Sequence, residues 1–151
     1  MLEFEHGGHL YRSRPIDTFT QFDILARCGP IIGPWFSIGA GADDPDSARN
    51  ILLQINAFME AIRKMTDDER HFVLRNALGT LQRRQTNGST EVWADVHKSG
   101  RFMFQDIDNL SDMLQLSARV LRELFTGFLS IQAGDQAGST EPARPTLVSN
   151  G

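Results

Sequence analysis

The short sequence FEHGGHLYR, near the start of the chain, constrains the fold more than any other segment. Two adjacent glycines suit a two-residue β-turn of type I′, because both central residues of that turn need positive φ angles. A turn at Gly7-Gly8 aligns an aromatic pair on one face of the two strands and a pair of opposite charges on the other. The aligned pairs are Phe4 with Tyr11 and Glu3 with Arg12. Residues 2–13 are therefore predicted to form a β-hairpin.

Two histidines flank the same turn, which raises the question of a metal site. His6 and His9 lie opposite each other in the predicted register and could reach one ion together. A catalytic zinc takes three protein ligands, and His97 could supply the third only if the tips of two hairpins met. A small metalloenzyme is therefore an alternative hypothesis, while solvated histidines without a metal ion are the expectation.

Apolar residues at helical spacing predict four helices in the rest of the chain. They run from Asp17 or Thr18 to about Cys28, from Asp46 or Ser47 to about Met65, from Thr66 to about Arg83–Gln85, and from Asp108–Ser111 to about Ile131. The third helix has a clear start signal, since Thr66 and Glu69 have the spacing of a capping box. The neighbouring Asp67 and Asp68 would point in different directions on a helix, so they are interpreted as first-turn residues rather than metal ligands.

Glycine and proline are frequent in residues 29–45, GPIIGPWFSIGAGADDP, although the segment is also apolar. Gly29-Pro30 is predicted to end the first helix. The segment is then expected to form a loop that folds back over the core, since exposed aromatic groups are costly in water. The alternative is a partner-binding segment that orders on contact, with Trp35 and Phe36 as candidate contact residues.

A second hairpin is predicted from strands at 91–96 and 101–104 around a turn at Ser99-Gly100. The last part of the chain is rich in glycine, serine, proline and charge, so residues 132–151 are expected to be disordered. The sequence thus predicts an α+β fold, mainly helical, in which about four helices and two small hairpins form a single compact domain over residues 1–131.

Composition and motifs argue against several classes of function. A net charge of −4 disfavours a nucleic-acid binder, and the basic pair Arg83-Arg84 is expected to be a solvated helix end. The single cysteine, Cys28, permits no internal disulfide and is expected to be buried. No apolar run is long enough for a membrane span and no signal peptide is visible, so a cytosolic protein is expected. Catalytic and phosphate-binding motifs are missing, which predicts a binding protein without enzymatic activity or cofactor.

Two blocks of the sequence resemble bacteriophage tail assembly chaperones, and the resemblance spans roughly residues 4–129. The first block, FEHGGHLYRSRPIDTFTQFDILARCGPII, has the strand, glycine turn, Tyr-Arg strand and Ile-Asp-x-Phe-x-Gln-Phe helix of that family. Its matching residues are Phe4, Gly8, Tyr11, Arg12, Ile16, Asp17, Phe19, Gln21, Phe22 and Pro30. The second block, FMFQDIDNLSDMLQLSARVLRELFTGFLS, matches through Met103, Phe104, Asp106, Ile107, Asp108, Met113, Leu114, Gln115, Leu116, Phe125 and Phe128.

The resemblance implies a function without chemistry. Such chaperones bind the phage tape measure protein, keep it soluble in the host cytoplasm until tail tube protein polymerises around it, and are absent from the finished particle. Binding of this kind needs an accessible apolar surface. The candidate contact residues are Trp35, Phe36, Ile38, Leu124 and Phe128. A structural component of the phage tail or neck is the alternative, and neither nucleic acid nor a membrane is an expected partner.

Overall fold

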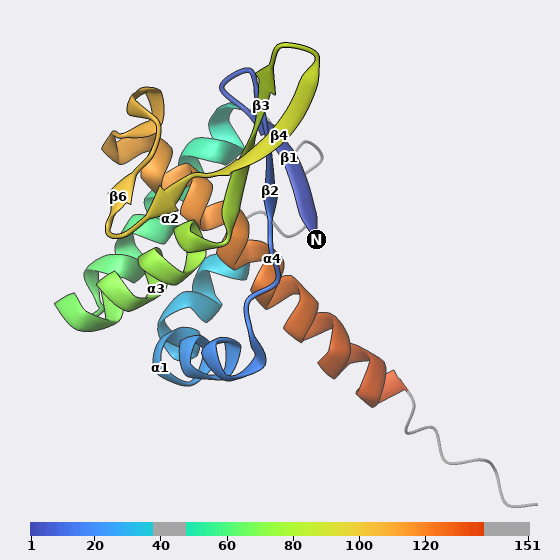
Figure 1. Ribbon diagram of the computed structural model, residues 1–151. Coiled ribbons are helices and arrows are strands. Elements are labelled where there is room, and N and C mark those ends of the chain that lie inside the picture. Colours follow the sequence, from blue (N-terminus) through green and yellow to red (C-terminus); the bar gives the residue numbers. More distant parts are fainter. Residues whose placement is uncertain (38–47, 138–151) are drawn as a thin grey trace, which may run out of the picture.

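A computed structural model describes residues 1–37 and 48–137 of the chain (Figure 1). The helices are α1 (Thr18–Ser37), α2 (Ala48–Arg63), α3 (Asp67–Gly79) and α4 (Leu110–Ala137), with a short 3₁₀ helix, η1 (Gln105–Ile107). The strands are β1 (Leu2–His6), β2 (His9–Ser13), β3 (Leu81–Asn87), β4 (Thr90–Asp95), β5 (His97–Lys98) and β6 (Arg101–Phe102). The predicted α+β class with a mainly helical content is confirmed.

The first hairpin has the register that the sequence predicts. β1 pairs with β2 so that Phe4 faces Tyr11 and Glu3 faces Arg12. The two turn glycines have φ angles of 56° and 77°, which a residue with a side chain rarely adopts. The rings of Phe4 and Tyr11 stack with their centroids 5.7 Å apart. The turn and the aromatic pair therefore fix the same alignment of the strands.

The hairpin belongs to a four-stranded antiparallel sheet with the strand order β1-β2-β3-β4. The third predicted helix was wrong at its end, because α3 stops at Gly79 and β3 begins at Leu81. In β3, Leu81 and Arg83 are buried while Gln82 and Arg84 are less buried or exposed, which is the two-residue period of a strand. This two-residue period was not recognised in the sequence, because Arg83 is buried. Two adjacent arginines after an apolar helix usually indicate that the helix ends in solvent.

The second hairpin was predicted with the wrong partner strand. β4 pairs with β3 over nearly its whole length, across a turn in which Gly88 has a φ angle of 65°. The predicted turn at Ser99-Gly100 is present, but it connects only the two-residue strands β5 and β6. The sequence TNGST, which connects β3 to β4, is therefore the turn of the larger hairpin.

Helix α1 continues past Gly29-Pro30, where the sequence predicted its end, and runs to Ser37. A proline inside a helix costs about 3 kcal/mol because it removes a hydrogen bond and crowds the preceding turn. Helical spacing of apolar residues nonetheless continues across Pro30, since Ile24 and Cys28 are fully buried and Ile31 packs against the same core. Burial of such side chains offsets the local cost, at about 1.5–3 kcal/mol for a fully buried isoleucine. The rest of the predicted loop, residues 38–47, lies outside the described residues.

Helix α3 begins with the capping box that the sequence predicts. The Thr66 hydroxyl accepts a hydrogen bond from the Glu69 amide at 3.3 Å, and the Glu69 carboxylate accepts one from the Thr66 amide at 3.1 Å. Such reciprocal bonds satisfy two of the amides that a helix start leaves free. Glu69 is therefore occupied with helix capping.

Helix α4 begins at Leu110, within the predicted range, but it extends beyond the predicted end near Ile131 and reaches Ala137. Its start is capped by the Asn109 side chain, which accepts from the Asp112 amide at 2.9 Å. The predicted disordered tail is therefore helical over residues 132–137. The rest of that tail, residues 138–151, is not among the described residues, and the domain boundary stays a prediction.

One buried core joins the sheet to the helices. Helices α1 and α4 each pack against both α2 and α3, and the sheet lies across the start of α4 (Figure 1). The largest fully buried side chains are those of Tyr11, Phe58, Ile24, Leu81, Leu116 and Leu121. Cys28 is buried among them as predicted, and this burial raises the pKa of its thiol to about 11. Sheet and helices therefore form a single cooperative unit.

Candidate partner-binding surface

The outer face of α1 carries two of the most exposed large apolar side chains in the described parts of the chain. Phe19 is 84% exposed and Phe22 is 67% exposed. The opposite face of the same helix is buried through Ile24 and Cys28. An amphipathic surface helix normally turns polar residues to the solvent, and a helix that is apolar on all sides is normally covered on all sides. The outer face of α1 is therefore an uncovered apolar surface.

Helix α2, which packs against α1, exposes further apolar side chains. Phe58 and Ile62 are buried, whereas Leu52, Leu53 and Met59 are exposed. Leu52 and Met59 have the helical spacing of the apolar residues that predicted this helix, but they lie outside the part that is buried. The apolar stripe of α2 is wider than the part that contacts the core. Helices α1 and α2 therefore both expose apolar side chains that are not buried by folding.

Two carboxylates lie beside the aromatic end of α1. Asp17 precedes the helix and accepts hydrogen bonds from the Thr20 amide and hydroxyl. The bond from the Thr20 side chain, followed by that from its backbone, lowers the pKa of Asp17, so the carboxylate is charged at neutral pH. Asp23 lies four residues after Phe19 on the same side of the helix. Neither carboxylate is in an ion pair with a described residue.

The five predicted contact residues fall on two helices and one segment outside the description. Trp35 and Phe36 lie near the end of α1, and Ile38 lies outside the described residues. Leu124 and Phe128 are one turn apart on α4, where Leu124 is half-buried against the core. Helix α4 packs mainly against α2 and α3, whereas α1 packs mainly against α2.

Phe19 and Phe22 were not among the predicted contact residues, because their spacing was interpreted only as a sign of a helix. The helix has apolar residues at both i+3 and i+5 from Phe19, so Phe22 and Ile24 lie on opposite sides. One apolar face of a helix covers only about 100° or somewhat more. An apolar pattern around the whole circumference was thus the signal in the sequence that could have identified this surface.

Three of the histidines, His6, His9 and His97, make contacts within the fold. The His6 Nε2 atom lies 2.6 Å from a carboxylate oxygen of Asp112, and the His6 side chain is only 15% exposed, so the prediction of a solvated histidine was wrong there. His9 Nε2 lies 2.8 Å from a guanidinium nitrogen of Arg83. His97 packs edge-on against the ring of Phe102. Within residues 1–37 and 48–137, no group of three or more possible ligands is placed to hold a metal ion.

Arg83 is the central residue of this polar cluster, and its prediction as a solvated helix end was wrong. The buried guanidinium donates to both carboxylate oxygens of Asp106, at 2.9 and 2.7 Å, and lies over the ring of Phe104. Partial burial acts to raise the pKa of Asp112, but hydrogen bonds from Asn109 and His6 outweigh it and lower that pKa. These polar contacts connect the sheet to the helical part of the chain. The His6 contact joins β1 to the start of α4, and the Arg83 contacts join β3 to β2 and to η1.

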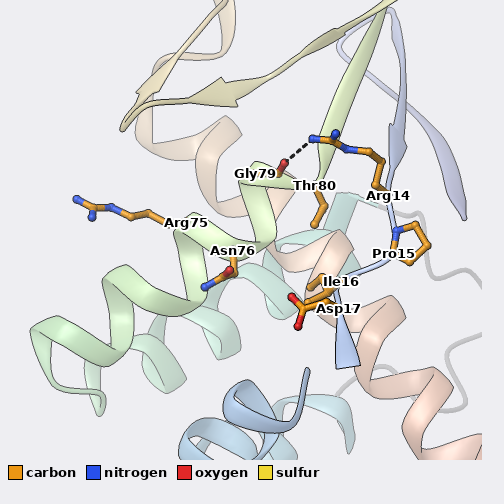
Figure 2. Close-up of a pocket in the computed structure, with 8 residues that line it drawn as sticks. All are labelled: Arg14, Pro15, Ile16, Asp17, Arg75, Asn76, Gly79 and Thr80. Atoms are coloured by element: carbon orange, nitrogen blue, oxygen red, sulfur yellow. Dashed lines mark hydrogen bonds between the residues drawn. The ribbon is translucent and has the colours of Figure 1, made fainter. Parts of the chain in front are cut away.

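A shallow polar pocket of about 350 Å³ lies where the first hairpin passes into α1 beside the end of α3 (Figure 2). It is lined by Arg14, Pro15, Ile16, Asp17, Arg75, Asn76, Gly79 and Thr80. Arg14 donates to the carbonyl of Gly79 at 3.1 Å and pairs with Asp95, while Figure 2 shows the Arg75 side chain extending away. Arg14 therefore connects the end of β2 to the end of α3 and to β4, and the pocket lining offers no nucleophile with an adjacent base.

A comparison with protein families identifies the chain. The family model described as phage tail assembly chaperone protein, TAC, matches residues 7–138. The chain belongs to this family. No curated protein and no solved structure is similar to it at a significant level.

Membership of the tail assembly chaperone family confirms the resemblance seen in the sequence. A chaperone of this family takes part in phage tail assembly by binding tail proteins, which indicates a non-catalytic role. No helix in the described part of the chain is long and apolar enough to cross a membrane. The exposed apolar surface of α1 and α2 is the feature of this tail assembly chaperone that best suits such binding.

Proposed function

We infer that this tail assembly chaperone binds the phage tape measure protein and keeps it soluble in the host cytoplasm during tail assembly, without catalysis. The observation that carries the inference is the exposure of Phe19 and Phe22 on a helix whose opposite face is part of the core. Exposed aromatic groups on a folded surface favour association with another apolar surface. The family of the chain supplies the setting in which that surface acts.

The size of the surface suits a chaperone that must later release its partner. Full burial of a phenylalanine contributes about 1.5–3 kcal/mol, so the two α1 phenylalanines together contribute roughly 3–6 kcal/mol. Association costs several kcal/mol in lost freedom, and a dissociation constant of about 1 μM corresponds to roughly 8 kcal/mol. Micromolar affinity would therefore need contacts from α2 in addition to those of α1. A binding free energy of this size would still allow tail tube protein to displace the chaperone.

The contact residues expected from the sequence extend this proposal. Trp35 and Phe36 are on α1 and therefore belong to the same helix as the exposed pair. Ile38 follows directly, and Leu124 and Phe128 lie on the second half of α4. We include them as proposed contacts of secondary weight, because exposure is established for Phe19 and Phe22.

Co-expression with the tape measure protein of the same phage tests the proposed function. The expected result is a soluble complex that co-purifies, together with a clear rise in soluble tape measure protein. Absence of both effects would contradict the proposal. Mass spectrometry of purified phage particles separates a chaperone from a structural tail or neck component, because a chaperone should be missing from the particles.

A further inference from the structure

We propose that the outer face of α1 is the docking site for one amphipathic helix of the tape measure protein, with basic residues on that helix facing the aromatic end of α1. The inference rests on the proposed function and adds the surface and the chemistry of the segment that it accepts. It combines three observations: the continuity of the apolar face, the open space above it, and the charges at its aromatic end.

The apolar face is continuous along the described part of α1. Phe19, Phe22, Ala26 and Pro30 are exposed, and their spacings of three, four and four residues place them on one side of the helix. At 1.5 Å per residue this face is about 17 Å long, or roughly three helical turns. A partner helix of about three turns with an apolar stripe matches that length, and two such helices pack along their axes with side chains interleaved.

The end of the face away from the phenylalanines leaves room for close approach. A Cβ atom added to Gly29 would meet no other heavy atom within 4 Å, so the space above this part of the helix is open. Ala26 is exposed one turn before it and adds only a methyl group. The two phenylalanines therefore stand at one end of the face, and beside them the helix presents a low region that large side chains of a partner can fill.

Two carboxylates beside the aromatic end are not neutralised by the nearest cations. Arg14 and Arg75 line the same pocket as Asp17, but Arg14 pairs with Asp95 and Arg75 extends away from Asp17 (Figure 2). Asp17 and Asp23 have no ion-pair partner among the described residues; Asp17 is exposed and Asp23 is partly buried. The one cation in residues 18–31 is Arg27, which lies 4.9 Å from the centre of the Phe72 ring of α3 and so faces a neighbouring helix. Basic residues on the partner would therefore be attracted to this end, and acidic residues would be repelled.

The first test compares two double variants of the full chain in the co-expression assay. Phe19→Gln with Phe22→Gln removes the aromatic end, while Val92→Thr with Met103→Gln removes two exposed apolar groups elsewhere. The expected result is at least a tenfold loss of co-purified tape measure protein for the first variant and less than a twofold change for the control. Equal recovery with both variants would overturn the docking site while leaving the proposed function intact. If the unchanged chain recovers none, the proposed function fails and this inference fails with it.

The second test addresses charge and uses synthetic peptides of 18 residues that carry the same leucine stripe. One peptide has lysines beside the stripe and the other has glutamates. The lysine peptide should bind the unchanged chain at least fivefold more tightly in fluorescence anisotropy. This preference should fall below twofold in Asp17→Asn with Asp23→Asn, which keeps the helix cap because asparagine caps as well as aspartate. Equal binding of the two peptides by the unchanged chain would overturn the charge assignment.

A second copy of this chain is the competing occupant of the same face. Sedimentation analysis of the unchanged chain and of Phe19→Gln with Phe22→Gln decides between the two occupants. The proposal predicts the same mass for both proteins across micromolar concentrations. A dimer that becomes a monomer in the variant would assign the face to self-association and overturn the proposal.

Discussion

The first hairpin and helix α1 follow each other in the chain but use their aromatic residues in opposite ways. Tyr11 is fully buried, stacks on Phe4 and lies inside a set of ionic contacts that connects the sheet to α4. Phe19 and Phe22 face the solvent. Both regions resemble the same chaperone family at the level of sequence, so sequence similarity does not distinguish a residue that stabilises the fold from one that is free to bind. The exposed fraction of each side chain does distinguish them, because a buried ring stabilises the fold whereas an exposed ring is available to a partner.

The largest effect on stability is expected from Tyr11→Ala. Removing a fully buried aromatic side chain should lower the free energy of unfolding by about 3–5 kcal/mol, measured by urea denaturation. Tyr11→Phe is the matched control. The Tyr11 hydroxyl is buried beside the Arg83 guanidinium but makes no well-formed hydrogen bond with it, so its removal should cost less than about 1 kcal/mol. A loss of similar size in both variants would show that the hydroxyl, and not the ring, stabilises the hairpin.

A smaller loss is expected from Asp106→Ala, which leaves the buried guanidinium of Arg83 without its carboxylate. Hydrogen bonds between charged groups contribute about 1.5–3 kcal/mol, and we expect a loss of about 2 kcal/mol because Asp106 is half exposed. Glu60→Ala, which removes the partner of Arg63 on the surface of α2, should cost less than about 0.5 kcal/mol. Equal losses in the two variants would contradict the role of Arg83 in fastening the sheet to η1.

The hydrogen bonds that Asp112 makes with Asn109 and, more weakly, with His6 predict how the stability of the protein depends on pH. The folded state lowers the pKa of Asp112 below its ordinary value of 3.8. The stability from this shift is therefore fully present above about pH 4 and is lost as the pH falls through the lower value of the folded state. Urea denaturation between pH 2 and pH 6 should show the unchanged chain losing more stability than Asp112→Asn over this range. Parallel curves for the two proteins would contradict the shift.

The smallest effect on stability is expected from Phe19→Gln with Phe22→Gln. Substitutions at exposed positions usually change the free energy of unfolding by less than about 0.5 kcal/mol, and glutamine has a good helix propensity. The thermal midpoint and the far-ultraviolet circular dichroism should therefore match those of the unchanged chain. A loss above about 2 kcal/mol would show that the two rings are part of the fold.

The sequence predicted those features that local chemistry determines. Gly7-Gly8 fixed the turn of the first hairpin, and the Thr66 and Glu69 side chains fixed the start of α3. The family was also accessible, because its motif consists of such local residues. Features that depend on distant partners were missed. β3 could not be identified because its buried Arg83 needs Asp106, which is 23 residues later.

The candidate surface was predicted only in part, for a physical reason. The sequence located α1 and the apolar residues that follow it, but two local rules proved insufficient. Gly29-Pro30 was expected to end the helix, although burial of Cys28 and Ile31 carries it further. Phe19 and Phe22 were counted only toward the helical spacing of α1, whereas Ile24 and Cys28 occupy its buried side. Which side of an apolar helix is covered depends on the packing of α2 and α3, and no local pattern shows it.

Radical footprinting of the chaperone alone and in complex with the tape measure protein tests the central claim most directly. Hydroxyl radicals modify exposed side chains, and mass spectrometry measures the rate at each residue. If the outer face of α1 binds the partner, modification of Phe19 and Phe22 should slow at least fivefold in the complex, while Val92 and Met103 should keep the rates that they have in the free protein. Unchanged rates at both phenylalanines in a complex that is fully formed would contradict the claim that the outer face of α1 binds the partner.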